Sequence, residues 1–124
     1  MKEALLVGAG GFLGSIMRYG LGRWAAAMAP GFPIPAGTLL VNVAGCFIIG
    51  LLFRLAEAQQ WPGAWRWFLF TGILGGFTTF SAFGLETFNL LRAGQTGPAL
   101  LNIAAQLLLG LGAVWAGYAL GRLA

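Results

Sequence analysis

The segment from Gly72 to Phe83 constrains the fold of this chain more than any other part of the sequence. It reads GILGGFTTFSAF and sets a Gly-Gly pair, two threonines and a serine inside an otherwise apolar stretch. Each glycine lowers helix propensity by about 1 kcal/mol relative to alanine. At membrane depth, irregular backbone is tolerated only where protein or a water-filled cavity satisfies the freed N–H and C=O groups. The segment therefore predicts a broken helix with a polar role at the break.

The composition predicts an all-α membrane protein. Of the 124 residues, 59% are hydrophobic and only 8% are charged, whereas soluble domains carry about 25% charged residues. Because a transmembrane helix needs about 20 apolar residues, the chain has room for four spans in a single domain, 1–124. We place the spans at about residues 4–27, 37–55, 67–91 and 99–120, with the third one broken.

The charge and the metal-ligand residues exclude several functions. The net charge is +4, but the seven Lys and Arg residues are scattered singly beside apolar segments, whereas nucleic-acid-binding proteins cluster them. We therefore expect no nucleic-acid partner. With no histidine and a single cysteine, Cys46, the chain cannot build a thiolate or imidazole metal site by itself. Glu86 has no evident acid–base partner, so we expect no enzymatic activity.

The basic residues leave the membrane orientation weakly determined. With four spans, one side of the membrane receives Lys2, Arg54, Arg66 and Arg122, and the other receives Arg18, Arg23 and Arg92. Orientation normally follows an excess of Lys and Arg in the cytoplasmic loops, and here the two sides nearly tie. The tie predicts insertion in both orientations, which allows an antiparallel homodimer, a closed two-fold assembly.

Small residues recur at helical spacing in three of the spans. The G-x-x-x-G pattern occurs at Gly10 and Gly14, at Gly72 and Gly76, and at Gly117 and Gly121. The pattern allows two helices to approach closely in lipid. The run around Gly8, Gly11 and Gly14 resembles a dinucleotide-binding turn, but such a site requires a βαβ unit with an acidic residue about 20 positions on. We interpret these glycines as packing residues.

Polar side chains share helix faces in the second and third spans. Thr38 and Asn42 lie four residues apart, hence on one face of a helix. A buried amide must be hydrogen-bonded, so Asn42 either joins two helices or faces a pore or substrate. Phe80 and Phe83 lie three residues apart beside Thr79. These rings either pack against neighbours or present their electropositive edges to an anion.

The fourth span carries a second polar stripe. Asn102 and Gln106 lie four residues apart, and two amides on one face should point to the protein interior or to water. Arg18 is an intramembrane charge, which indicates function by default, although a long side chain can also reach the interface.

Three blocks together resemble the Fluc fluoride channels, also called the CrcB family: GGFLGSIMRY (residues 10–19), GTLLVNVAGCFIIG (residues 37–50) and GILGGFTTFSAF. The resemblance covers the whole four-span layout. It implies a small antiparallel, dual-topology homodimer in the cell inner membrane, which passes fluoride passively out of the cell through two pores and holds a structural Na⁺ at the dimer centre.

The resemblance also assigns roles to individual residues. It implies that Asn42 donates hydrogen bonds to fluoride and that Phe80 and Phe83 supply ring edges along the pore. Thr38, Thr79, Asn102 and Gln106 would lie along the ion path, Arg18 and Glu86 at a vestibule, and the backbone carbonyls of Gly75 and Thr78 at the sodium. Many family members have a row of Tyr and Ser hydroxyls where this chain has Asn102 and Gln106. We expect this departure to affect the rate at which fluoride passes.

Two other classes of protein compete with the channel. A proton-coupled exporter of the small multidrug type is also short and four-spanning, but it needs a membrane-embedded carboxylate. The first span has no acid after Glu3, so Glu86 is the only candidate. The third class is a membrane scaffold without transport activity, in which the polar residues only join helices.

Overall fold

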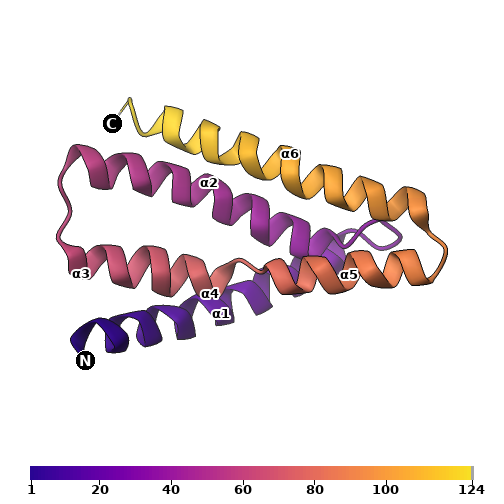
Figure 1. Cartoon of the computed structure of the whole chain (residues 1–124), viewed down its shortest axis with the longest axis horizontal. Coiled ribbons are helices and arrows are strands. Elements are labelled where there is room, and N and C mark those ends of the chain that lie inside the picture. Colours follow the sequence, from indigo (N-terminus) through magenta and orange to yellow (C-terminus); the bar gives the residue numbers. More distant parts are fainter. Residues whose placement is uncertain (124) are drawn as a thin grey trace.

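The structure is a computed structural model that describes residues 1–123, and in these residues it contains helices and no strand. The elements are α1 (Lys2–Met28), α2 (Ala36–Ala58), α3 (Gly63–Arg66), the π-helical segment η1 (Trp67–Leu74), α4 (Gly75–Phe77), α5 (Phe80–Arg92) and α6 (Thr96–Leu120) (Figure 1). The four elements from α3 to α5 follow one another as a single span, Gly63–Arg92. With α1, α2 and α6 this gives four helices long and apolar enough to cross a membrane, which confirms the predicted fold class.

The helices pack as two pairs. Helix α2 has its largest interface with α6, and α1 has its largest interface with η1 and α4. The two chain ends lie at the same end of the molecule, and the turn between α5 and α6 lies at the opposite end (Figure 1). Helix α5 crosses over to pack on α6. The third span thus contacts α1 before its break and α6 after it.

Glycines make the close helix contacts possible. A Cβ on Gly14 of α1 would overlap the backbone of Ile73 and Phe77, and one on Gly76 would overlap the backbone of Gly11. In the other pair, a Cβ on Gly117 of α6 would overlap the backbone of α2. These contacts confirm the interpretation of the G-x-x-x-G patterns as packing motifs.

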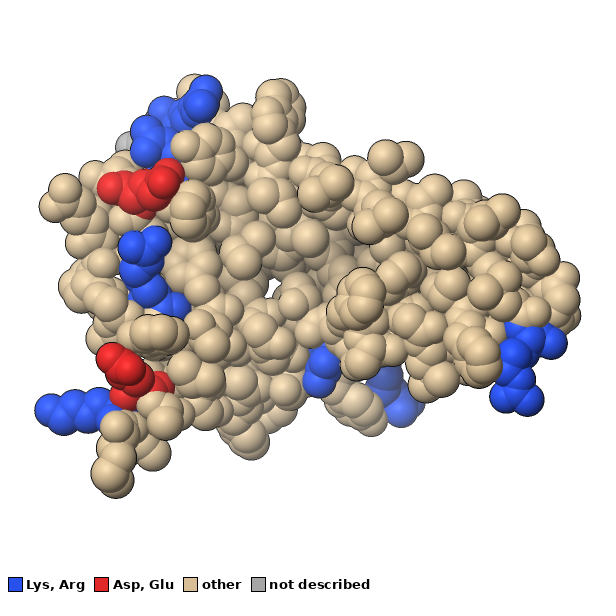
Figure 2. Space-filling model, viewed as in Figure 1, with Lys and Arg blue, Asp and Glu red and all other residues tan. Residues whose placement is uncertain are grey.

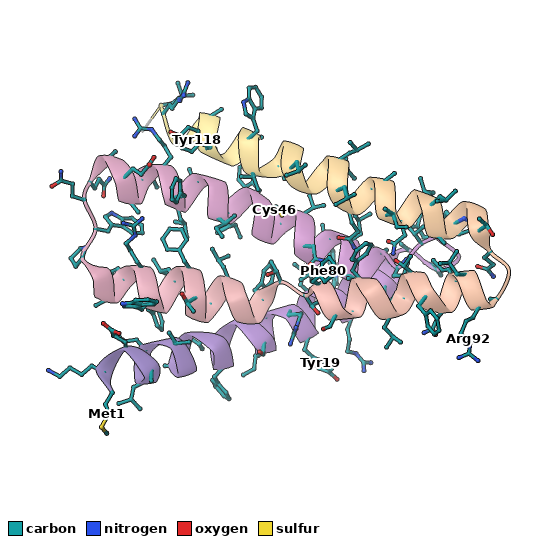
Figure 3. The ribbon with its side chains drawn as sticks, viewed as in Figure 1. Met1, Tyr19, Cys46, Phe80, Arg92 and Tyr118 are labelled. Carbon is teal, nitrogen blue, oxygen red and sulfur yellow. The ribbon has the colours of Figure 1, made fainter. Side chains whose placement is uncertain are left out.

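Most large apolar side chains point outward. On α6, Leu111 is 70% exposed and Trp115 is 74% exposed, as expected for side chains that contact lipid. Most charged side chains lie at the end that carries both termini, and further basic side chains lie partway along the lower edge and at the far end (Figure 2). Arg92 lies at the end opposite Met1 and Tyr118 (Figure 3). The end that carries both termini is therefore rich in charge, as expected at a membrane surface.

The third span is broken within the predicted segment, residues 72–83. Gly75 and Gly76 remain helical in α4, and the backbone turns extended at Thr78 (φ −82°, ψ 157°) and Thr79 (φ −148°, ψ 112°). The prediction of a broken helix within residues 72–83 is confirmed, and the extended residues are the two threonines rather than the glycine pair. Gly76 instead allows a close contact with Gly11, and the extended backbone at the break needs a polar partner inside the membrane.

Candidate functional site

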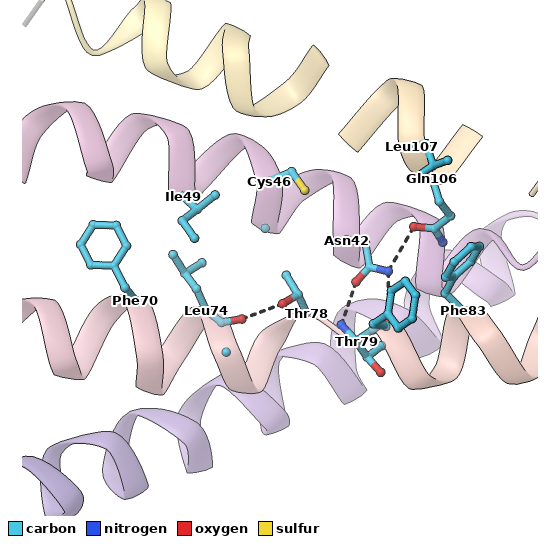
Figure 4. Close-up of a pocket in the computed structure, with 13 residues that line it drawn as sticks. Asn42, Cys46, Ile49, Phe70, Leu74, Thr78, Thr79, Phe83, Gln106 and Leu107 are labelled. Carbon is cyan, nitrogen blue, oxygen red and sulfur yellow. Dashed lines mark hydrogen bonds between the residues drawn. The ribbon is translucent and has the colours of Figure 1, made fainter. Parts of the chain in front are cut away.

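Asn42 binds the backbone at the break of the third span. Its side-chain Oδ1 accepts a hydrogen bond of 2.8 Å from the Thr79 N–H, and its Nδ2 donates one of 3.1 Å to the Thr79 carbonyl (Figure 4). Both polar groups of an extended residue are thereby satisfied inside the membrane, where each unsatisfied group is costly. Asn42 therefore stabilises the break from the neighbouring helix α2.

Gln106 of α6 extends this contact to a third helix. Asn42 Nδ2 also donates a hydrogen bond of 3.1 Å to Gln106 Oε1 (Figure 4). The two amides and the Thr79 backbone thus form one network across α2, α6 and the break. Asn42 thus joins helices, and it also lines a cavity beside the break.

The break leaves the backbone carbonyls of residues 75–78 without their helical donors, and for two of them the donor is bound to another group. In a continuous helix the Thr79 N–H would donate to the Gly75 carbonyl, but here it donates to Asn42. Likewise the Ala82 N–H would donate to the Thr78 carbonyl, but it donates to Thr79 Oγ1 at 3.2 Å, an N-cap of α5. The carbonyls of Gly75 and Thr78 are the two that the family resemblance assigns to a cation.

A cavity of about 360 Å³ opens beside the break. Its polar lining residues are Asn42, Thr78, Thr79 and Gln106, and its aromatic ones are Phe70, Phe80 and Phe83. The rings of Phe80 and Phe83 lie edge to face, with centroids 5.4 Å apart and planes at 62°. Phe80 is 81% exposed, so its ring is free to meet a molecule that covers this face.

A second cavity of about 240 Å³ lies on the other side of the break. Arg18, Thr38 and Thr79 are among its lining residues, and Thr79 therefore borders both cavities. Thr38 Oγ1 donates a hydrogen bond of 2.6 Å to Glu86 Oε1, while Glu86 Oε2 is buried without a partner among the described residues. The structure thus brings Arg18 and Thr38 together in one cavity, with Glu86 bonded to Thr38 and absent from the lining of the larger cavity.

Asn102 lies apart from the other amides. It is fully buried, and its Nδ2 donates a hydrogen bond of 2.9 Å to Thr87 Oγ1, whereas Gln106 borders the larger cavity. The two residues of the predicted polar stripe therefore have different surroundings: Asn102 lies in a contact between helices, and Gln106 lines a cavity. Sequence reasoning missed Thr87, although a hydroxyl in an apolar helix facing a buried amide is a signal for such a pair.

Comparison with known proteins matches the whole of this architecture. The family model described as "CrcB-like protein, Camphor Resistance (CrcB)" matches residues 5–118. A protein of Thermus thermophilus named "Fluoride-specific ion channel FluC" is 49% identical over 98% of this chain and 94% of its own length. Proteins of the same name from Parabacteroides distasonis (46% identical; 98% of this chain, 94% of its own length) and Rhizobium meliloti (50% identical; 98% of each chain) also match.

Proposed function

This chain belongs to the CrcB family, and from that premise we propose that it is a fluoride-selective channel that lets fluoride leave the cell passively across the inner membrane. It is a multi-pass membrane protein, and the relatives that match it over nearly their full length carry the name of a fluoride-specific ion channel. The proposal extends that activity to this chain.

The lining of the larger cavity is the observation that carries the proposal. It combines amides, hydroxyls and the rings of Phe80 and Phe83, with no Lys or Arg among its lining residues. A selective pore must replace the hydration shell of its ion and still bind weakly enough for release. Hydrogen-bond donors and electropositive ring edges offer fluoride such replacement without a fixed positive charge that would trap it.

Arg18 and Thr38 suit a vestibule on the other side of the break. They border the smaller cavity, which meets the larger one at Thr79. A single arginine at an entrance raises the local concentration of anions. Fluoride would enter or leave past Arg18 and reach the ring edges past Thr79.

An antiparallel homodimer accounts for the open face of the single chain. The larger cavity is bordered by the strongly exposed ring of Phe80, and a second copy related by a two-fold axis would cover it and complete a pore. Two copies then provide two equivalent pores, each built around one break.

The carbonyls of Gly75 and Thr78 fit a structural Na⁺ at the centre of that dimer. Both have lost their helical donors to Asn42 and to Thr79 Oγ1, and hard cations prefer oxygen ligands. A broken membrane helix is where such carbonyls become free to bind an ion. Two carbonyls from each copy would give four oxygens, and the ion would hold the two breaks together.

The test is ion efflux from liposomes that contain the purified full-length chain. Fluoride should leave down its gradient much faster than chloride, and without a pH gradient, as a fluoride-selective electrode would record. Equal rates for the two anions would contradict a selective channel. Proton exchange driven by a cationic drug, without fluoride flux, would instead support the multidrug exporter.

A further inference from the structure

We propose that Arg54 and Arg122 form a binding site for the phosphate of an anionic phospholipid, at the membrane surface where α2 and α6 end. The site lies apart from the two cavities beside the break, because neither arginine lines either of them. The inference goes beyond the proposed function and does not depend on it. It needs only a chain that spans a membrane, which the four long apolar helices support.

Gly121 allows the side chain of Arg54 to lie under the end of α6. A Cβ at Gly121 would lie 2.9 Å from Cβ and 3.0 Å from Cγ of Arg54. The apolar stem of Arg54 is therefore held in the contact between α2 and α6. Because Gly121 directly precedes Arg122, the two arginine side chains start from neighbouring positions on the two helices.

The Nε–H group of Arg54 is a buried donor without a partner. Among residues 1–123 no acceptor lies within hydrogen-bond distance of Nε. An arginine stays protonated in a protein, and a buried donor without a partner costs free energy. A bound anion would remove that cost. The planar guanidinium matches the oxygens of a phosphate, which it can bind with two parallel hydrogen bonds.

Arg122 supplies a second, accessible cation at the same place. Its side chain is exposed, and its guanidinium carbon lies 5.3 Å from the centre of the Tyr118 ring, a cation–π contact. Glu57, one turn after Arg54 on α2, accepts a hydrogen bond of 3.4 Å from the Tyr118 hydroxyl. The two arginines outnumber this carboxylate, so the local charge favours an anion.

The helix face that leads to Arg122 indicates that the phosphate belongs to a lipid. Leu111 is 70% exposed and Trp115 is 74% exposed, and the spacing of four and seven residues places Leu111, Trp115 and Arg122 on one face of α6. Trp is enriched at the level of the lipid headgroups, and a long arginine side chain reaches from apolar surface to that level. Most charged side chains of the molecule lie at this end (Figure 2). A phospholipid could thus place its acyl chains along Leu111 and its phosphate at the arginines.

Native mass spectrometry of the purified full-length chain in detergent tests the site. The chain is mixed with equal amounts of phosphatidylglycerol, which is anionic, and phosphatidylcholine, which is zwitterionic, both with the same acyl chains. The parent should prefer phosphatidylglycerol, and equal binding of the two lipids would overturn the proposal. Arg54→Met keeps the apolar stem and removes the guanidinium. It should weaken phosphatidylglycerol binding about tenfold to a hundredfold, the effect of losing a hydrogen bond to a charged group, and parent-level binding would contradict the site.

Two further variants separate a built site from a general attraction of cations for anionic lipid. Arg54→Lys keeps the charge but loses the planar fork and its Nε–H, so it should bind phosphatidylglycerol more weakly than the parent does. Arg92→Met is the matched control, because Arg92 is also exposed and lies 5.8 Å from the centre of a ring, that of Phe88, but at the opposite end of the molecule (Figure 3). It should bind like the parent. Parent-level binding by Arg54→Lys, or an equal loss in Arg92→Met, would overturn the inference.

Arg122→Gln covers the case in which Arg54→Met does not fold, as gel filtration would show. It changes an exposed residue beyond the last turn of α6 and should also reduce the preference for phosphatidylglycerol, whereas an unchanged preference would contradict the role of Arg122. Inorganic phosphate distinguishes the two sources of a phosphate group. It should not displace phosphatidylglycerol at equal concentration, because it lacks acyl chains; displacement would show that the site takes the free ion and not a lipid.

Discussion

Asn102 of α6 donates a hydrogen bond of 2.9 Å to Thr87 of α5, and Thr87 in turn donates one of 2.8 Å to the backbone carbonyl of Phe83. Asn102 is 0% exposed and Thr87 is 7% exposed. The chain of two bonds connects α6 to the residue that presents a ring to the larger cavity. Because α5 starts at the break and has little other packing, this buried pair fixes how α5 is rotated and where the ring of Phe83 points.

Removal of Thr87 should destabilise the protein more than removal of Asn102. Thr87→Val leaves a fully buried amide without any partner, which costs about 1–3 kcal/mol. Asn102→Leu removes the amide with its single bond, and interhelical hydrogen bonds in membranes contribute about 0.6 kcal/mol on average. Unfolding followed by circular dichroism in detergent should therefore give the lower midpoint for Thr87→Val.

The double variant Asn102→Leu with Thr87→Val checks the explanation. It should be more stable than Thr87→Val alone, because no unpaired amide remains. A larger cost for Asn102→Leu than for Thr87→Val, or costs that simply add in the double variant, would contradict the pairing.

Sequence patterns located the spans of this fold but not the exact place of the break. Hydropathy and length sufficed for four helices, and glycine spacing sufficed for the contact between α1 and the third span. The break occurs at Thr78 and Thr79 because Asn42, which lies 37 positions away in the sequence, binds the Thr79 backbone. Local helix propensity points to the glycine pair and carries no information about such a distant partner.

The residues of the site could likewise be predicted from spacing, but their partners could not. Spacing placed Thr38 with Asn42 and Asn102 with Gln106, yet each pair divides between different partners. Residues four apart on a helix differ by about 40° in direction, and the neighbouring helix decides which of them meets a cavity. Asn102 does not line the cavity because it donates a hydrogen bond to Thr87. This partner becomes known only from the packing of α5 on α6.

Gly14→Ala should destabilise the protein strongly. A Cβ at Gly14 would overlap the backbone of Ile73 and Phe77, so α1 must move away from the third span. Overpacking of this kind typically costs about 1–3 kcal/mol, and the midpoint of thermal unfolding in detergent should fall accordingly. Gly8→Ala is the control on the same helix, because nothing lies within 4 Å of its Cβ position. Equal midpoints for the two variants would contradict the close packing.

Phe80→Ile and Phe83→Ile separate the chemistry of the rings from their bulk. Isoleucine keeps much of the apolar volume but lacks the electropositive ring edge. We expect at least one of the two variants to lose most of its fluoride efflux while gel filtration still shows assembled protein. If both conduct like the parent, the rings serve only for packing and the aromatic part of the proposed pore is wrong.

Dual topology predicts that lysines added on one side of the membrane abolish fluoride efflux. Co-expression of two variants with lysines on opposite sides should restore it. Lys and Arg near the span ends dominate orientation, and this chain has only seven of them. Gln59→Lys with Gln60→Lys adds two charges to the exposed connection after α2, and Gln95→Lys with Thr96→Lys adds two to the exposed turn before α6. Each double variant should insert in one orientation, opposite to the other.

An antiparallel dimer needs both orientations, so each double variant alone should give little fluoride efflux from cells, and co-expression of the two should restore it. A C-terminal reporter should be active on both sides of the membrane in the parent and on one side in each variant. The neutral substitutions Gln59→Asn with Gln60→Asn control for the change of side chain, since only Lys and Arg contribute strongly to orientation. A parent reporter confined to one side, with full fluoride flux, would exclude the antiparallel homodimer and require a parallel arrangement of the two breaks.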